Sequence, residues 1–405
     1  MKIKYFFALL SIFALFLNRS FSKISPYGGP VEATMFLGLM FRAKPFLRFC
    51  KNYPVLIIIF IYALVVLAKD LLVYGVEFEY FRRAAMFFYA FMPAFFLLYA
   101  KEISVLVRRN LLILSLFFFL IIFLNIPGFQ PTMAAELAGA LFLASILYSR
   151  NVLVSLVFLG CFLFSASGLS SGQSLFRTPF VTLFVGLFFL VVFIIYKGFV
   201  SKKLVLIFSF CSVILISMIF SPIVGETIGG VLLGLSGLVN SSVLFDLGVA
   251  LGGDVSSSRG SSAGTTETRA FFWGAIVVHQ LSNPMNFLFG NGFSSGFLNV
   301  VLPDFSFSNK DLIEPHNSFM GIFFKLGIVG LLLFLKLLKD VVGVCSSYVG
   351  FWKLAPFLSI ATLFASFEVA LENPHGAFIF WGIIFVPVVF ELASAENKKI
   401  KTGNI

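Results

Sequence analysis

The chain has 405 residues, of which 60% are hydrophobic and 18% are aromatic, with 57 Phe, while only 12% are charged. Soluble globular domains average roughly 45–50% apolar and about 25% charged residues, so this composition, with a mean hydropathy of +1.03, excludes an ordinary soluble domain. The net charge of +11 would suit a nucleic-acid partner, but its distribution along the chain is explained more simply by membrane topology.

Apolar runs long enough to cross a membrane recur along the whole sequence. A hydrocarbon core of about 30 Å needs about 20 helical residues, and each span must satisfy its backbone hydrogen bonds internally, which favours helices. We therefore expect an all-α polytopic membrane protein with about twelve transmembrane helices. The predicted spans are 5–17, 30–42, 54–69, 84–100, 111–125, 134–148, 152–167, 178–196, 204–221, 319–338, 353–370 and 376–394.

Three segments follow from these spans. Residues 1–221 are expected to form transmembrane helices 1–9, residues 222–318 one large outer loop with short helices, and residues 319–405 transmembrane helices 10–12 with a short tail. The apolar run after Lys2 and Lys4 also has the character of a signal peptide. The sequence that follows it offers no A-x-A-like cleavage site, so we expect a retained first span.

Basic residues divide unevenly between the two sides of the predicted spans. With the N-terminus inside, most of the 29 Lys and Arg residues fall on the inner side. Cytoplasmic loops carry such an excess, so we expect both termini in the cytoplasm and no nucleic-acid partner. The four cysteines include no CxxC pair, which disfavours disulfides and structural zinc.

The predicted outer loop combines a flexible composition with a helical pattern. The tract GGDVSSSRGSSAGTTET, residues 252–268, is rich in Gly, Ser and Thr, and we expect it to be mobile. The segment RAFFWGAIVVHQL that follows predicts a helix, and Asn283-Pro284 and the GNG of 290–292 predict turns. The two halves of the chain share no internal repeat, which disfavours an inverted-repeat transporter.

His316 is the leading candidate for chemistry. It stands in EPHNSFMGIFFKLGIVG, residues 314–330, where the outer loop meets an apolar run. A neutral His titrates near physiological pH and accepts a proton from a hydroxyl, so a His at this lip suits a general base. The structural alternative is that Asn317 or Ser318 simply caps the following helix.

Four arginines on the predicted outer side form a second group of candidates. Arg82 and Arg83 open one span, Arg177 opens another, and Arg269 begins the loop helix. Arg269 lies four residues before Trp273, so the two share a helix face. Guanidinium groups bind phosphate through two parallel hydrogen bonds, whereas the structural alternative is contact with lipid head groups.

Ionisable residues inside or beside the last spans form a third group. Lys325 is the seventh residue of its predicted span, and Glu368 lies near the outer end of the next one. Charges at such depth are usually paired or functional, and an ion pair between them is the structural alternative. Glu372 and His375, in LENPHG, are further candidates on the same side. The sequence contains no Walker A, HExxH, GxSxG or DxD pattern, so no cofactor and no metal are expected.

Several of these residues together resemble the O-antigen polymerase and O-antigen ligase superfamily. The similarity lies in one large outer loop, the pair His316-Asn317, and the helix sequence from Gly327 to Leu331. It covers about residues 165 to 340, and Lys325 departs from it because an acidic residue is common there. The loop helix and the turns after it carry the rest of the resemblance, at Arg269, Trp273, Asn283, Pro284, Gly290 and Gly292.

The resemblance implies metal-independent glycosyl transfer on the periplasmic face of a bacterial inner membrane. The donor would be an oligosaccharide on undecaprenyl pyrophosphate, and His316 would act as base on the acceptor hydroxyl. Arg177, Arg269 and one of Arg82 or Arg83 would bind the pyrophosphate, with Asn317 and Trp273 as further contacts. Besides this substrate, the expected partners are membrane lipids and a chain-length regulator.

Three functions stay open on the sequence. A polymerase joins lipid-linked repeat units, a ligase transfers the finished glycan to lipid A-core, and a carrier or flippase moves the lipid-linked glycan. The single His-Asn pair and the Phe-rich body favour the polymerase, while the single large loop before the tenth span suits the ligase. The nearly apolar spans disfavour the carrier.

Overall fold

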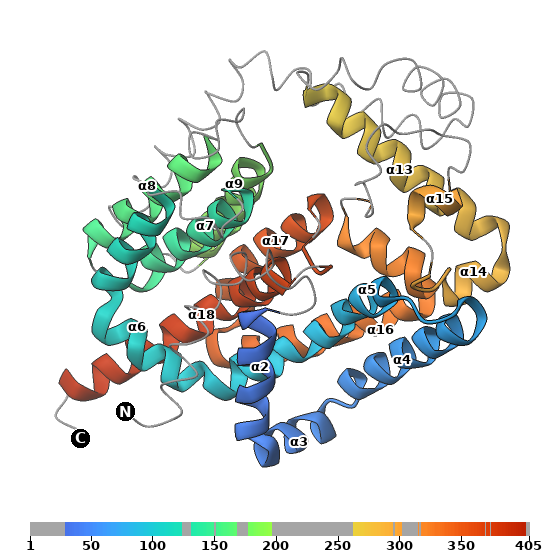
Figure 1. Ribbon diagram of the computed structural model, residues 1–405. Coiled ribbons are helices and arrows are strands. Elements are labelled where there is room, and N and C mark those ends of the chain that lie inside the picture. Colours follow the sequence, from blue (N-terminus) through green and yellow to red (C-terminus); the bar gives the residue numbers. More distant parts are fainter. Residues whose placement is uncertain are drawn as a thin grey trace. The chain divides into compact units, whose positions relative to one another are not determined.

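The computed structural model consists of helices, with no strand among the residues that it describes (Figure 1). This agrees with the all-α prediction. The described residues are 29–123, 131–149, 151–167, 177–196, 262–294, 296–301, 315, 317–368, 370–372 and 374–401.

The chain divides into two compact units, which are described separately. Unit 1 comprises Met1–Phe60, Ala85–Ile207 and Leu335–Ile405, and unit 2 comprises Ile61–Ala84 and Phe208–Phe334. Three helices contribute residues to both units because the boundaries fall within them. These are α4 (Val55–Tyr74), α5 (Phe78–Phe88) and α16 (Ser318–Val349).

Unit 1 is a bundle of apolar helices in which α7 packs against α8 and α9, α17 packs against α9 and α18, and α18 packs against α6. Its core is dense in aromatic rings, such as Trp381 and Phe385. Within this core Thr182 donates to Glu136 at 2.6 Å, and the partly exposed Lys353 pairs with Glu391 at 2.8 Å. The helices of unit 1 are α2 (Pro30–Phe41), α3 (Ala43–Asn52), the short η1 (Tyr89–Phe91), α6 (Met92–Phe123), α7 (Pro131–Tyr148), α8 (Val152–Ala166), α9 (Arg177–Tyr196), α17 (Phe351–Phe367) and α18 (Pro374–Lys401).

Six helical segments in the described part of the chain are long and apolar enough to cross a membrane, so the protein is membrane-embedded. They correspond to seven of the predicted spans. Predicted spans 30–42, 152–167 and 353–370 form apolar helices of fewer than 18 residues, and spans 5–17 and 204–221 lie outside the described residues. The six segments are Val55–Tyr74, Phe78–Leu120, Pro131–Tyr148, Thr178–Ile195, Ser318–Val349 and Pro374–Ala395.

One predicted connection is wrong. Residues 101–110 were expected to form a basic loop between spans 84–100 and 111–125, but they are helical within α6. The helix is interrupted at a single residue, Asn110, with φ −129° and ψ 20°. Lys101, Arg108 and Arg109 therefore lie on a helix, whose backbone groups are paired along the chain rather than with solvent.

Unit 2 is built around the predicted loop helix. This helix, α13 (Ser262–Ser282), begins seven residues before the predicted start, so the end of the Gly/Ser/Thr-rich tract is helical. Asn283 caps α14 (Pro284–Phe289), and Gly290 and Gly292 have positive φ, which confirms both predicted turns. A short helix, α15 (Phe297–Val301), then packs on α13.

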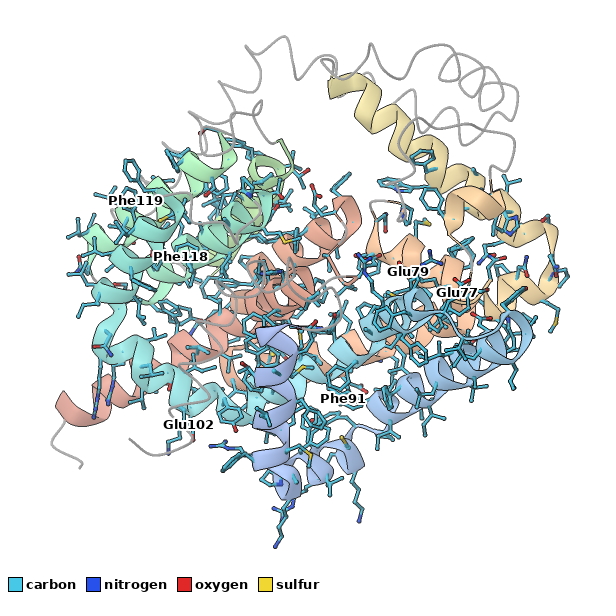
Figure 2. All side chains as sticks on the ribbon, in the orientation of Figure 1. Glu77, Glu79, Phe91, Glu102, Phe118 and Phe119 are labelled. Carbon is cyan, nitrogen blue, oxygen red and sulfur yellow. The ribbon has the colours of Figure 1, made fainter. Side chains whose placement is uncertain are left out.

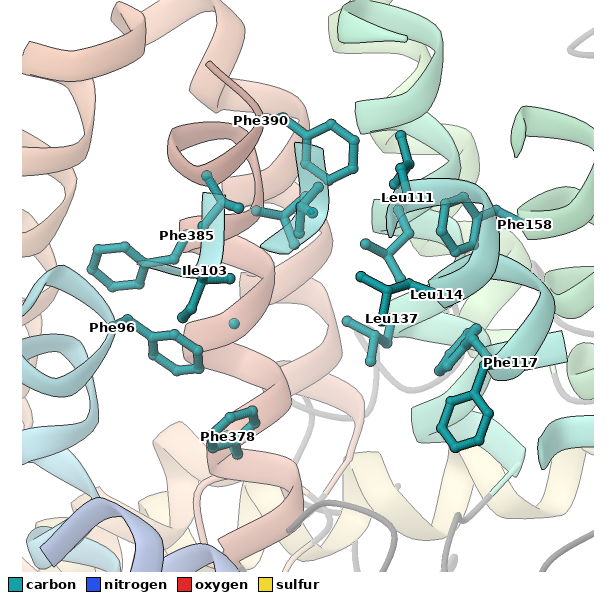
Figure 3. A pocket seen from close by; sticks show the side chains of 16 residues that line it. Phe96, Ile103, Leu111, Leu114, Phe117, Leu137, Phe158, Phe378, Phe385 and Phe390 are labelled. Carbon is teal, nitrogen blue, oxygen red and sulfur yellow. The ribbon is translucent and has the colours of Figure 1, made fainter. Parts of the chain in front are cut away.

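Unit 1 also contains a cavity of about 190 Å³ between α6, α7, α8 and α18 (Figure 3). All of its lining side chains are apolar, including Phe96, Leu114 and Phe158. A wall without hydrogen-bonding groups is unsuited to a glycan or a charged ligand. The polar features of the molecule are therefore the better place for a candidate site.

Candidate functional site

Unit 2 contains a helix that breaks inside an apolar segment. Helix α16 is interrupted at Gly327, where φ is 65° and ψ is −167°, a conformation that only glycine adopts readily. The first part of the helix, residues 318–326, therefore ends within the protein. A helix end leaves its last four carbonyls without partners in the helix, and in a membrane protein these groups must find other donors.

Donors from elsewhere in unit 2 reach all four of these carbonyls. Gln280 donates its side-chain amide to Phe323 O at 2.7 Å and to Phe324 O at 3.2 Å. Two backbone N–H groups of the GNG turn also donate: Asn291 N to Phe324 O at 2.8 Å and Gly292 N to Lys325 O at 3.0 Å. The Tyr62 hydroxyl donates to Leu326 O at 3.0 Å.

The GNG turn approaches the broken helix closely enough to require glycine on both sides. A Cβ at Gly327 would overlap the backbone of Leu288 and Phe289, and a Cβ at Gly290 would overlap the carbonyl of Lys325. Gly290 also has a φ of 77°, which disfavours any residue with a side chain. The turn and the break thus fit each other as one junction, which we call the Gly327 junction (residues 288–294 and 323–327).

Asp70 holds the far end of the junction. Its buried carboxylate accepts the N–H groups of Phe293 and, at 3.0 Å, Ser294. Gly292 is required at this point because a Cβ there would overlap the same carboxylate. Hydrogen bonds to an ionised acceptor are stronger than neutral ones, so Asp70 fixes the loop firmly to α4.

A side-chain network stiffens the junction from the α13 side. The amide nitrogen of Asn291 donates to Gln280 Oε1 at 2.8 Å, and Asn291 Oδ1 lies 3.0 Å from His279 Nε2. The side-chain nitrogen of Asn286 lies 3.4 Å from the same His279 Nε2, so two amide side chains meet at this ring nitrogen. His279 and Gln280 are neighbours on α13, so one turn of that helix organises both the junction and its donors.

Helix α13 is also hydrogen-bonded to Pro315, the residue that precedes His316. The indole of Trp273 donates to Pro315 O at 2.9 Å, and Pro315 directly precedes His316. Beneath this bond, Phe272 and Ile276 of α13 pack against Phe323 and Phe324 of α16. Asn317 then caps α16, since its Oδ1 accepts the N–H of Met320 at 3.0 Å, which is the structural role considered for it.

The two arginines of α5 differ in their surroundings. Arg83 is 13% exposed and donates to Phe293 O at 2.9 Å, so it is committed to the junction. Arg82 is 58% exposed and lies 3.5 Å from Glu79, an exposed ion pair of little energetic weight. Of the two, Arg82 is the one with a guanidinium available to a ligand.

The predicted site residues fall into both units. Arg82, Arg83, Arg269, Trp273, Asn317 and Lys325 belong to unit 2, where Arg269 lies on α13 one turn before Trp273 and Lys325 is buried in α16. His316 lies outside the described residues. The members of unit 1 are Arg177 at the start of α9, Glu368 at the end of α17, Glu372, and His375 in the first turn of α18.

The ion pair considered for Lys325 and Glu368 stays a prediction, because the two residues belong to different units. Sequence reasoning missed Asp70, Gln280, Asn291 and Tyr62, which together hold the junction. The available signal was a pair of polar residues in an apolar run, as at Lys69-Asp70 and His279-Gln280, since such residues in membrane segments need a partner.

Comparison with known proteins gives no family for this chain. No known family model matches the sequence, and no curated protein matches it significantly. Any function must therefore be argued from the residues and their geometry.

Proposed function

We propose that the protein is a membrane glycosyltransferase that polymerises a surface polysaccharide, joining repeat units carried on undecaprenyl pyrophosphate at the periplasmic face. The proposal rests on the resemblance of the His316 and Arg269 segments to the O-antigen polymerase and ligase superfamily. It includes a topology of about twelve spans with 222–318 as the periplasmic loop, in which α6 connects spans 84–100 and 111–125 through the kink at Asn110.

The hydrogen bond from Trp273 to Pro315 carries the proposal. It joins the two segments that resemble the family, although 42 positions separate these residues. Arg269 is one turn from the donor on the same helix face, and His316 is the residue after the acceptor. Arg269, the cation for the leaving group, is therefore close along the chain to the donor of this hydrogen bond. His316, the base for the acceptor, is next to the residue that accepts it.

The chemistry assigns each group a separate task. His316 takes the proton from the acceptor hydroxyl while its oxygen forms the new bond to the anomeric carbon. The bond from that carbon to the pyrophosphate oxygen breaks, and the lipid pyrophosphate leaves with the electron pair. Arg269, Arg177 and Arg82 bind the departing group and stabilise its growing charge.

The Gly327 junction and the packing around it support the start of α16, which follows His316 in the chain. Asn317 and the first turn of α16 are fixed by the cap and by the Phe272 cluster, so the lip that carries His316 begins from a defined position. Residues on supported elements keep catalytic geometry better than residues on free loops.

A broken helix is also a feature of carriers, because transporters use unwound carbonyls to bind ions. Here each of the four carbonyls from Phe323 to Leu326 already accepts a hydrogen bond from a protein donor. The break therefore serves internal packing, which favours the enzyme over the carrier.

The banding of surface polysaccharide tests this function. A strain lacking the gene is complemented with the wild type or with His316→Ala at equal expression. A polymerase predicts a full ladder for the wild type and core with one repeat for the variant. Core without any repeat, with polymer accumulating on the lipid carrier, would indicate the ligase instead. A full ladder from the variant would refute the role of His316.

A further inference from the structure

Helix α3 (Ala43–Asn52) presents a row of positive charge on one face. Lys44, Arg48 and Lys51 are spaced i, i+4 and i+7, which places them together on a helix. All three are exposed, and α3 contains no acidic residue. Among the described residues none forms an ion pair with them.

The opposite face of α3 packs against other residues of unit 1, so the row of three basic side chains has a fixed orientation. The ring of Phe46 lies edge-on to Phe91 with centroids 5.6 Å apart, and Cys50 is buried. That burial raises the pKa of the Cys50 thiol. Figure 2 shows nitrogen-bearing side chains that extend from α3 away from the neighbouring helices.

Arg42, which precedes the row, is already used by the protein. Its guanidinium pairs with Glu102 of α6 and lies 4.4 Å from the centre of the Tyr99 ring. Four basic residues in this segment thus divide into one structural residue and three that face outward. The three are not needed to hold α3 in place.

The expected depth of α3 in the membrane follows from the helices to which it is connected. Only Tyr53 and Pro54 separate it from α4, a membrane-crossing candidate, so α3 lies at the end of a span. Leu47, 64% exposed, borders the row, and Met40 and Phe41 at the end of α2 are similarly exposed. A basic row beside exposed apolar side chains is the composition of the zone where headgroups meet hydrocarbon.

We propose that α3 binds the headgroups of anionic phospholipids through Lys44, Arg48 and Lys51. Each basic residue near an anionic membrane surface strengthens binding by about fivefold, and the effect weakens with salt. Three residues held on one face act together on a small group of lipids, which goes beyond their contribution to topology. This inference does not depend on the proposed enzymatic function.

Lipid retention by the purified protein tests the proposal. The full chain is reconstituted in nanodiscs with equal parts phosphatidylglycerol and phosphatidylcholine, re-extracted, and its bound lipids are counted by mass spectrometry. The test variant is Lys44→Gln/Arg48→Gln/Lys51→Gln. The matched control, Lys101→Gln/Arg109→Gln/Lys339→Gln, removes the same charge from exposed residues of α6 and α16.

We expect the wild type and the control to retain phosphatidylglycerol and the test variant to lose this preference by about a hundredfold in affinity, from three charges. The charge-conserving variant Lys44→Arg/Arg48→Lys/Lys51→Arg should retain it, which separates charge from folding. Added salt should weaken retention, whereas soluble inorganic phosphate should compete poorly. Equal retention by the test variant, or equal loss in the control, would overturn the proposal.

Discussion

Two long helices of this protein are interrupted, and they are interrupted in different ways. Helix α6 departs from helical geometry at Asn110, whose side chain donates to Leu106 O at 3.4 Å, four residues back on the same helix. Helix α16 breaks at Gly327, and its freed carbonyls accept hydrogen bonds from Gln280, Asn291, Gly292 and Tyr62, which lie on three other segments.

The break in α6 is a local bend, whereas the break in α16 depends on hydrogen bonds from other segments. A bend satisfied by its own helix needs little from the rest of the chain, so it tolerates substitution. A break satisfied by distant residues exists only when the surrounding structure is complete, and strained backbone persists only where it is over-determined. The Gly327 junction is therefore the place where the fold of unit 2 is most specific.

The largest expected effect is at the junction itself. Gly327→Ala should destabilise the protein by about 3 kcal/mol or more, because alanine cannot adopt this φ and its Cβ would overlap Leu288. The check is the thermal unfolding temperature and folded yield in detergent. Gly343→Ala, on the same helix with no atom within 4 Å of the new Cβ, should be neutral or stabilising.

Asp70 should come next. Asp70→Asn replaces two charge-assisted hydrogen bonds to the Phe293–Ser294 backbone by weaker neutral ones, so we expect a loss of about 2 kcal/mol. Limited proteolysis and thermal unfolding measure it. Asp340→Asn, which removes one partner of the Lys336 pair on an exposed helix face, should change stability by less than about 1 kcal/mol. Equal losses of stability in Asp70→Asn and Asp340→Asn would contradict the role of Asp70 in fixing the Gly327 junction to α4.

The two breaks are compared directly by removing one amide from each. Gln280→Leu leaves the Phe323 carbonyl without its side-chain donor and should cost about 1–3 kcal/mol. Asn110→Leu removes only a local hydrogen bond and should stay within about 0.5 kcal/mol of the wild type. A larger effect at Asn110 than at Gln280 would reverse the distinction drawn between the breaks.

The smallest effect on stability is expected at Arg82. Arg82→Gln should leave the unfolding temperature nearly unchanged and lower glycosyl transfer, since its exposed guanidinium is assigned to the pyrophosphate. Arg83→Gln should instead lower stability by about 1–3 kcal/mol because Phe293 O loses its donor. Normal transfer by the Arg82 variant would exclude Arg82 from the site.

The sequence allowed the fold class and several local features to be predicted, because they depend on neighbouring residues. Apolar runs define α4, α9 and α18, and Asn283-Pro284 with GNG defines the turns after α13. The break at Gly327 was not predicted, since the hydrophobic pattern around this glycine predicts one continuous span. The break is explained only by Leu288 and Phe289, which pack against Gly327 from another segment.

The same reasoning explains the result for the candidate site. Arg82 and Arg83 are adjacent and chemically identical, so the sequence could not separate them, and only the position of Phe293 O assigns Arg83 to structure. Asp70 was missed because predicted span 54–69 ended just before it, whereas α4 continues to Tyr74. The helical conformation of residues 101–109 was likewise not predicted, because their three basic residues are typical of a connection between spans.

The most direct test of the central claim is chain extension by purified protein in nanodiscs, with a lipid-linked repeat unit as the only substrate and no divalent metal. The wild type should produce polymers, and His316→Ala, with an unchanged unfolding temperature, should be slower by about 10²–10⁴-fold, the usual contribution of a general base. Trp273→Phe, which removes the donor to Pro315 O, should be slowed by a smaller factor. Chain extension by His316→Ala at the wild-type rate would contradict the account.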